Sequence, residues 1–238
     1  MAFPSILELA SAFFDLLYPR ICAGCGQELV RSDSPICQDC FHQLRPFSPP
    51  FCPRCGAPLY QPLAHGKHRC RYCPGGIHFF DRLRSVFSYK DPIVKNLIHS
   101  LKFDYQTRMA IPLSKMLLDG FLQHFTREPI DAIVPVPLHK SRYREREFNQ
   151  ATLLCRTIAE KTNLPIREDL VFRIRKTPPQ TSLQPLQRMK NLERAFVPAS
   201  GSAARGLRIL IIDDVMTTGA TINAVSNALR QSGAQTIY

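Results

Sequence analysis

Two adjacent carboxylates stand just before a threonine-rich segment near the carboxyl end of the chain. Asp213 and Asp214 follow an apolar run at 207–212, and Thr217-Thr218-Gly219-Ala220-Thr221 comes two residues later. Glycine lets a backbone approach an anion closely, and a helix expected at 219–231 would present free N–H groups and its positive dipole end. The threonine hydroxyls add donors. The pattern predicts a site for a phosphate monoester, beside carboxylates that can bind a diol or a divalent ion.

Other phosphate loops do not match this segment. A Walker-type loop needs Gly-Lys-Ser/Thr, and a dinucleotide fingerprint needs Gly-x-Gly-x-x-Gly. Neither pattern occurs here. The alternative is an ordinary strand–turn–helix unit in which Asp and Thr serve only as caps.

Eight of the nine cysteines form four Cys-x-x-Cys pairs, all within the first 73 residues. They are Cys22/Cys25, Cys37/Cys40, Cys52/Cys55 and Cys70/Cys73. Two such pairs complete a tetrahedral thiolate site for a soft divalent ion. We therefore expect two structural zinc sites. Each is formed by two pairs that are consecutive in the chain, because the shorter loops cost less entropy to close. A crossed pairing, disulfides and an iron–sulfur cluster are the alternatives. Cys155 stands apart in an apolar helical pattern and reads as a buried structural thiol.

Two further segments are rich in cations. Leu138, His139 and Lys140 follow an apolar run at 130–136, and the stretch after them interleaves basic and aromatic residues: Arg142, Tyr143, Arg144, Arg146 and Phe148. Such interleaving can hold a single nucleic-acid strand through phosphates and stacked bases. A solvated charged turn is the alternative, because Glu145 and Glu147 offset part of the charge. Arg175 and Lys176 begin a second basic loop with two prolines, which reads either as a mobile loop or as a linker.

Composition places the chain among soluble globular proteins with polyanionic partners. It has 238 residues, 45% of them hydrophobic, and 31 Lys and Arg against 19 Asp and Glu give a net charge of +12. No run reaches the roughly 18 apolar residues that span a bilayer. We expect an amphipathic helix at 4–17 that docks on the protein, and a cytoplasmic location with membrane association only through partners.

The elements expected after residue 80 alternate between strands and helices. Strands are predicted at 82–89, 130–136, 170–174, 207–212 and 235–238, and helices at 91–101, 107–125, 149–161 and 219–231. This order favours an α/β fold with a mostly parallel sheet and helices on both faces. Ligands in such folds bind beyond the carboxyl ends of the strands, so we expect the site after 136, 174 and 212.

The segment 209–221 resembles the signature of type I phosphoribosyltransferases. The order of motifs along 19–238 resembles the ComF family of competence proteins, which is related to GntX: four cysteine pairs, Val-Pro-Val-Pro-Leu at 134–138, Phe-Asn-Gln at 148–150 and then the acidic pair. The resemblance implies a double zinc ribbon at 19–78 and a phosphoribosyltransferase-like domain at 79–238, after the helix within 1–18. The family usually extends beyond the last strand, so we expect that strand to be truncated at Tyr238.

Site roles follow from the resemblance. Asp213 and Asp214 would bind the ribose hydroxyls of phosphoribosyl pyrophosphate with Mg²⁺. The loop would bind its 5-phosphate and pyrophosphate would lie near 138–140. Arg175 and Lys176 are catalytic candidates. The residues expected to contact this ligand are Asp213, Asp214, Met216, Thr217, Thr218, Gly219, Ala220, Thr221, Leu138, His139 and Lys140.

Three functions follow from these observations and from the resemblance. The first is a phosphoribosyltransferase acting on an unidentified base or nucleotide. The second is a binder of single-stranded DNA that uses the ribosyl site as a sensor, with other DNA-uptake proteins as partners in natural transformation. The third is a zinc adaptor that binds no small ligand.

Overall fold

A computed structural model describes residues 19–29, 34–59, 70, 73, 78–176 and 194–238. The amphipathic helix expected at 4–17 and most of the basic loop that begins at Arg175 lie outside these residues. Within them, no helix combines the length and the apolar character needed to cross a membrane.

A parallel sheet forms the centre of the fold. It comprises β1 (Ala132–Pro135), β4 (Arg208–Ile212) and β5 (Thr236–Ile237), in the order β1-β4-β5. A parallel bridge between Ile133 and Ile166 extends it beyond β1, and the Asp81 backbone N–H donates to the Ile237 carbonyl beyond β5. The expected α/β class with a parallel sheet is confirmed.

The helices occupy most of the ranges that the sequence periodicity predicts. They are α2 (Gln38–Gln43), α3 (Pro92–Phe103), the short 3-10 helix η2 (Thr107–Met109), α4 (Ala110–His124), α5 (Lys140–Arg146), α6 (Gln150–Thr162) and α8 (Ala220–Gln231). Local capping explains several starts: the Asp91 carboxylate accepts from the Ile93 and Val94 N–H groups, with Pro92 at the first helical position.

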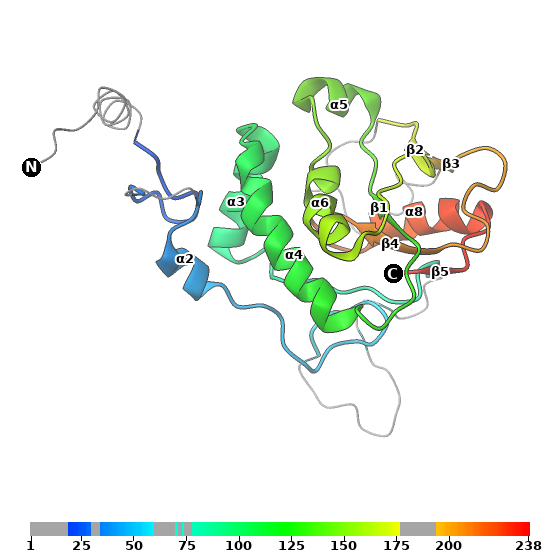
Figure 1. The fold of residues 1–238 in the computed structure, drawn as a ribbon, viewed down its shortest axis with the longest axis horizontal. Helices are drawn as coiled ribbons and strands as arrows, with labels where there is room; N and C mark the ends of the chain where they lie inside the picture. The colour runs from blue at the N-terminus through cyan, green and yellow to red at the C-terminus, as the bar shows by residue number, and fades with distance from the viewer. Residues whose placement is uncertain (1–18, 30–33, 60–69, 71–72, 74–77, 177–193) are drawn as a thin grey trace, which may run out of the picture.

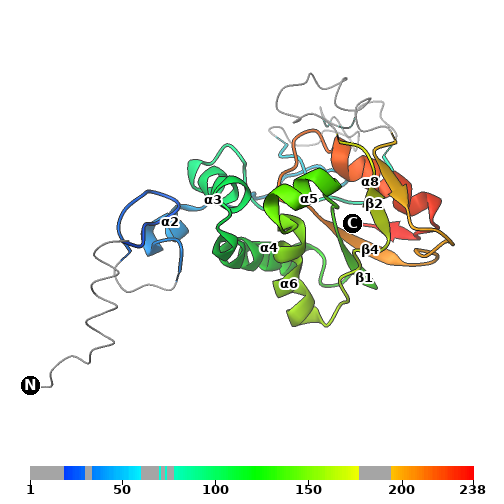
Figure 2. The same cartoon turned by 90° about the horizontal axis from the view of Figure 1, so that it is seen from above.

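Two hydrophobic cores lie on the two faces of the sheet. Ile133, Leu210 and Ile212 face the core that includes α3, α4 and α6, whereas Val134 and Ile211 face the core that includes α8. Successive strand residues point to opposite faces, so one continuous apolar run can feed both cores. Figures 1 and 2 show α4 and α6 on one side of the sheet and α8 on the other.

Three expected elements differ from the structure. β2 (Val171–Arg173) pairs antiparallel with β3 (Phe196–Pro198) in a separate two-stranded sheet, so Ile174 does not lie at the carboxyl end of a parallel strand. The strand expected at 82–89 is not formed, because its backbone bonds singly to the cysteine segments, with Leu83 N–H donating to the Arg54 carbonyl and Phe47 N–H to that of Val86. The polar stretch after His139 is helical, as α5.

Candidate functional site

The acidic pair lies where the carboxyl ends of two neighbouring strands meet. β1 and β4 are in register with Pro135 opposite Ile212, and the Val136 N–H donates to the Ile212 carbonyl at 2.9 Å. The residues that follow each strand therefore leave the sheet at the same edge. This brings Asp213 and Asp214 next to the segment that leads to His139, as expected for ligand sites in parallel sheets.

The threonine loop leads into a helix whose N-cap residue is a glycine. Gly219 is the N-cap residue of α8, has φ +74° and offers no side chain to the first turn. Only glycine takes such a left-handed conformation without strain. Thr217 and Thr218 are exposed, and the Thr218 Oγ1 accepts a long bond of 3.4 Å from Ala220 N–H. The amides, hydroxyls and dipole of this turn suit a phosphate group.

Cations from three distant segments interact with the acidic pair. Lys102, near the end of α3, places its Nζ 2.5 Å from Asp214 Oδ2, and the Asp214 side chain is only 4% exposed. Burial lowers the pKa of Arg146, and the Asp214 charge partly offsets that shift. Burial likewise lowers the pKa of Arg173, with Asp213 as the offsetting charge. The arrangement therefore combines two carboxylates with three cations and a threonine-rich loop.

The two carboxylates do not ionise independently. The pKa of Asp213 is raised to about 8, because burial disfavours the charged form and the adjacent Asp214 repels a second negative charge. Lys102 opposes this shift through its positive charge. A carboxyl group held largely protonated near neutral pH is poised to ionise when a cation or a donor-rich ligand arrives.

The segment expected to bind pyrophosphate runs into a short helix. His139 precedes α5 and caps it, since its Nδ1 accepts from the Ser141 N–H at 3.2 Å and lies 2.8 Å from Ser141 Oγ. Leu138 and His139 are partly buried, and they follow β1 at the edge of the sheet where the acidic pair lies. Lys140 is exposed. Their role with pyrophosphate stays a prediction.

α5 exposes some of the residues that we predicted to bind nucleic acid and buries others. Tyr143 and Arg144 are exposed, and Arg142 is half-buried in an ion pair with Glu145 at 3.0 Å. Arg146 instead points inward, with 8% of its surface exposed, and its Nη1 donates to Gln150 Oε1. Phe148 packs against the core beneath α3, α4 and α6. The outward-facing part of this helix is thus its first turn and a half.

Sequence reasoning missed two cations of the site, Lys102 and Arg173, and emphasised two others. Arg175 and Lys176 are exposed at the start of the basic loop, and no contact of theirs with the acidic pair is recorded among the described residues. Arg173, earlier in the same segment, is the cation whose pKa responds to the charge of Asp213. A cation on the inward side of an alternating strand, between Phe172 and Ile174, is a signal that could have identified it. For Lys102, at the end of an amphipathic helix, the sequence offers no comparable signal.

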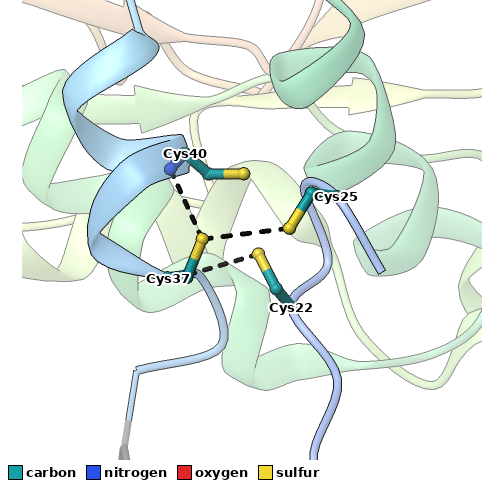
Figure 3. Close-up of side chains that lie close together, drawn as sticks. All are labelled: Cys22, Cys25, Cys37 and Cys40. Carbon is teal, nitrogen blue, oxygen red and sulfur yellow. Dashed lines mark hydrogen bonds between the residues drawn. The ribbon is translucent and has the colours of Figure 1, made fainter. Parts of the chain in front are cut away.

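The first four cysteines converge on one point. Figure 3 shows Cys22, Cys25, Cys37 and Cys40 directed at one another, with Cys25 Sγ 3.9 Å from Cys37 Sγ. Four sulfurs at about 2.3 Å from one zinc ion lie about 3.8 Å apart. The Cys37 N–H donates to Cys22 Sγ at 3.2 Å. Burial alone would raise the pKa of Cys22, but backbone donors from Cys37, Cys25 and Gly24 lower it to about 6.

The second set, Cys52, Cys55, Cys70 and Cys73, repeats the arrangement. Its sulfurs lie within 4.8 Å of one another, with Cys52 and Cys73 3.9 Å apart and Cys55 and Cys70 3.5 Å apart. All nine cysteines are unbonded, so disulfides are excluded in this structure. The pairing is sequential, as predicted. Both sets offer four thiols and fit closed, structural zinc sites rather than catalytic ones.

The same backbone turn carries the first pair of each set. Cys22 N–H donates to the Gln27 carbonyl and Gly26 N–H to that of Cys22, and the same bonds join residues thirty positions later, from Cys52 to Ala57 and from Gly56 to Cys52. Gly56 has φ +68°, and a Cβ there would lie 2.6 Å from the Leu83 carbonyl oxygen. Glycine is therefore required sterically as well as conformationally.

Each cysteine set belongs to a different one of the two hydrophobic cores. Cys22 and Cys40 belong to the core of α3, α4 and α6, and the Asn96 side chain on α3 donates to the Gly24 carbonyl at 3.1 Å. Cys52, Cys55 and Cys70 belong instead to the core of β4 and α8. Figures 1 and 2 show α2, from the first set, beside α3. The two sets thus contribute to two cores of the α/β fold.

Comparison with known proteins identifies the relatives of this chain. A family model described as a double zinc ribbon domain matches residues 13–74. The DNA utilization protein YhgH of Salmonella typhi is 33% identical over 225 residues, which cover 93% of this chain and 96% of that protein. Competence protein F of Haemophilus influenzae is 30% identical over 221 residues, 91% of this chain and 93% of that protein.

Two further proteins are more distant. Competence protein ComFC of Bacillus subtilis is 28% identical over 219 residues, 86% of this chain and 82% of that protein. The solved structure of glutamine phosphoribosylpyrophosphate amidotransferase from B. subtilis, complexed with ADP and GMP, is 18% identical with a TM-score of 0.36, covering 56% of this chain and 25% of that one. This structural similarity is too weak to support any conclusion about the present chain. The first two relatives match nearly full length, and the chain therefore belongs to the ComF family, with competence protein F, ComFC and YhgH.

Proposed function

We propose that this chain binds phosphoribosyl pyrophosphate with Mg²⁺ and handles single-stranded DNA during DNA uptake. The observation that carries the first part is the meeting of the Asp213–Asp214 pair, the glycine-led start of α8 and the cations Lys102 and Arg173 at one edge of the sheet. Two carboxylates alone would suit many ligands. Carboxylates beside both a phosphate-type loop and buried cations suit a sugar that carries several phosphates.

The proposed pose assigns each part of the ligand to a different group. The 5-phosphate lies on the loop 217–221, and the ribose hydroxyls donate to Asp213 and Asp214. The pyrophosphate lies toward Lys102 and the segment 138–140. Mg²⁺ prefers oxygen ligands, which the pyrophosphate, the hydroxyls and these carboxylates supply, and when bound it would screen the pyrophosphate charge.

The DNA part of the proposal is supported by charge and by the relatives. The net charge of +12 favours polyanions, and Tyr143 and Arg144 project outward from α5 beside Arg142. Two relatives that match nearly the whole chain carry names that refer to DNA utilization and competence. Handling of single-stranded DNA in uptake accounts for both observations, with other DNA-uptake proteins as further partners.

Isothermal titration tests the ligand directly. We expect the zinc-loaded protein to bind phosphoribosyl pyrophosphate in the presence of Mg²⁺, and to bind ribose 5-phosphate more weakly because the pyrophosphate contacts are lost. No heat with either compound would contradict the proposal. Release of pyrophosphate when bases or nucleotides are added would assign turnover in addition to binding.

Replacing Lys102 by methionine tests the cationic surround. Lys102 pairs with Asp214 and lowers the pKa of Asp213, so K102M is expected to raise the pH at which Asp213 ionises. It also removes a cation near the proposed pyrophosphate. We expect binding at neutral pH to weaken by about tenfold or more, because a charge-assisted hydrogen bond contributes roughly 1.5–3 kcal/mol. K115M, on α4, is the matched control, and equal binding by K102M and wild type would remove Lys102 from the site.

A further inference from the structure

The outer face of α3 carries a row of residues that do not belong to the core. Lys95, His99 and Phe103 recur every four residues and are all exposed, so they share one face of the helix. The His99 and Phe103 rings lie 4.8 Å apart between centroids, inclined at 41°. Phe103 is 51% exposed. Two adjacent exposed rings form a patch, which is informative where a single exposed apolar side chain is not.

A second exposed ring follows at a strained position. Tyr105 lies two residues beyond α3, is 51% exposed and has φ 55°, the left-handed region. A bulky side chain is rare in that conformation, and glycine or asparagine would adopt it at lower cost. The turn is held by the Gln106 N–H, which donates to the Ser100 carbonyl at 3.1 Å. Neither stability nor solubility favours a tyrosine at this position.

A buried cation connects these rings to the candidate site. The guanidinium carbon of Arg146 lies 5.4 Å from the Phe103 ring centroid, although Arg146 itself is only 8% exposed. The charges of Tyr105, Asp214 and Arg142 all act on Arg146. Phe103 thus contacts the last residue of α5, and its neighbour in the chain, Lys102, pairs with Asp214. Phe103 makes a cation–π contact with a buried cation while about half of its surface stays exposed.

We propose that Phe103 and Tyr105 form a stacking surface for the bases of single-stranded nucleic acid, which passes the edge of the candidate site. The inference rests on the DNA part of the proposed function and locates the DNA on the protein surface. Exposed rings flanked by the cations Lys95, Arg108 and Arg142 match a polyanion whose bases are unpaired. A duplex keeps its base faces stacked inside and would not use such rings.

One charge on this surface acts against phosphate. Asp104 lies between the two rings in sequence, 47% exposed, and its Oδ2 is 3.7 Å from His99 Nδ1. The carboxyl end of α3 also carries the negative end of the helix dipole. Bases rather than phosphates therefore lie over Phe103 and Tyr105, with the phosphates toward the flanking cations. This arrangement predicts that removal of the Asp104 charge strengthens binding of the nucleic acid.

Fluorescence anisotropy with a labelled oligothymidylate, on the full zinc-loaded chain, tests the surface. We expect F103A and Y105A each to weaken binding by about fivefold or more, as loss of a stacked base does, with an unchanged salt dependence. K95M and R108M should reduce the salt dependence instead. Y89A is the matched control, because Tyr89 is 39% exposed near the opposite end of α3. D104N should bind a few-fold more tightly, which a merely structural role for this segment does not predict.

The outcomes separate the two proposals. If the wild type fails to bind the oligonucleotide, the DNA part of the proposed function fails and this inference with it. If the wild type binds and F103A and Y105A bind equally well, only the stacking surface is overturned. Y105N keeps a side chain that tolerates the left-handed backbone, so weak binding by Y105N would assign the effect to the ring rather than to a disturbed turn.

Discussion

Replacing Asp213 by asparagine is expected to weaken binding of phosphoribosyl pyrophosphate about 100-fold while making the ligand-free protein more stable. Asparagine keeps the size of the side chain but removes the charge that would accept the ribose hydroxyls, and a lost bond to a charged group costs roughly 1.5–3 kcal/mol. Titration calorimetry of D213N and wild type with Mg²⁺ measures the first effect. Equal affinities would remove Asp213 from the binding site.

The stability gain follows from the pKa of Asp213. The folded-state pKa is raised from 3.8 to about 8, so the folded protein retains a proton that the unfolded chain releases. The wild type is therefore expected to lose stability progressively between about pH 4 and pH 8, and a permanently neutral asparagine avoids that loss. We expect the advantage of D213N in urea unfolding to be small at pH 4.5 and larger at pH 8.

Asp131 supplies the control of opposite sign. Hydrogen bonds from Arg208 lower the pKa of Asp131 to about 2, so its ionised form stabilises the folded state above the unfolded pKa. D131N should therefore destabilise the protein at pH 8, modestly because both side chains are about one-third exposed. If D213N were destabilising like D131N at pH 8, the burial and repulsion argued for the acidic pair would be wrong.

Loss of a single cysteine ligand is expected to have unequal effects in the two zinc sites. C25A and C55A should each lower the zinc content by one ion per chain, since a site with three thiolates binds zinc far more weakly. C55A should also lower the unfolding midpoint by about 10 °C or more. Cys55 is buried in the core shared with β4 and α8, whereas Cys25 is exposed at the outer edge of the first site.

Cys155 provides the matched control for these variants. It is fully buried on α6 and lies in neither cysteine set, so C155A should keep two zinc ions and cost only the small cavity that it leaves. Zinc released to a chromogenic chelator, together with thermal unfolding by circular dichroism, measures both quantities. A C55A protein that unfolds at the wild-type midpoint would contradict the role of the second site in the core.

Local patterns account for what could be predicted about the fold. The helices α3, α4, α6 and α8 follow from apolar spacing and from caps such as Asp91, which act within a few residues. The prediction of a strand at 82–89 was wrong, because alternation of polar and apolar residues does not specify a partner strand. The backbone of this segment instead forms hydrogen bonds with the cysteine segments. α5 was missed because its charged residues carry no apolar period, and its helix depends on the His139 cap and the buried Arg146.

The sequence by itself determined the chemistry of this protein: four cysteine pairs with metal-ligand spacing, and an acidic pair followed by a phosphate-type loop. Those signals are local, because the residues that act together are neighbours in the chain. Only the tertiary structure decided what surrounds them. It brought Lys102 to Asp214 across more than a hundred residues, turned Arg146 inward and divided the cysteine sets between two cores. Such contacts depend on which helix faces meet, and sequence spacing does not specify that.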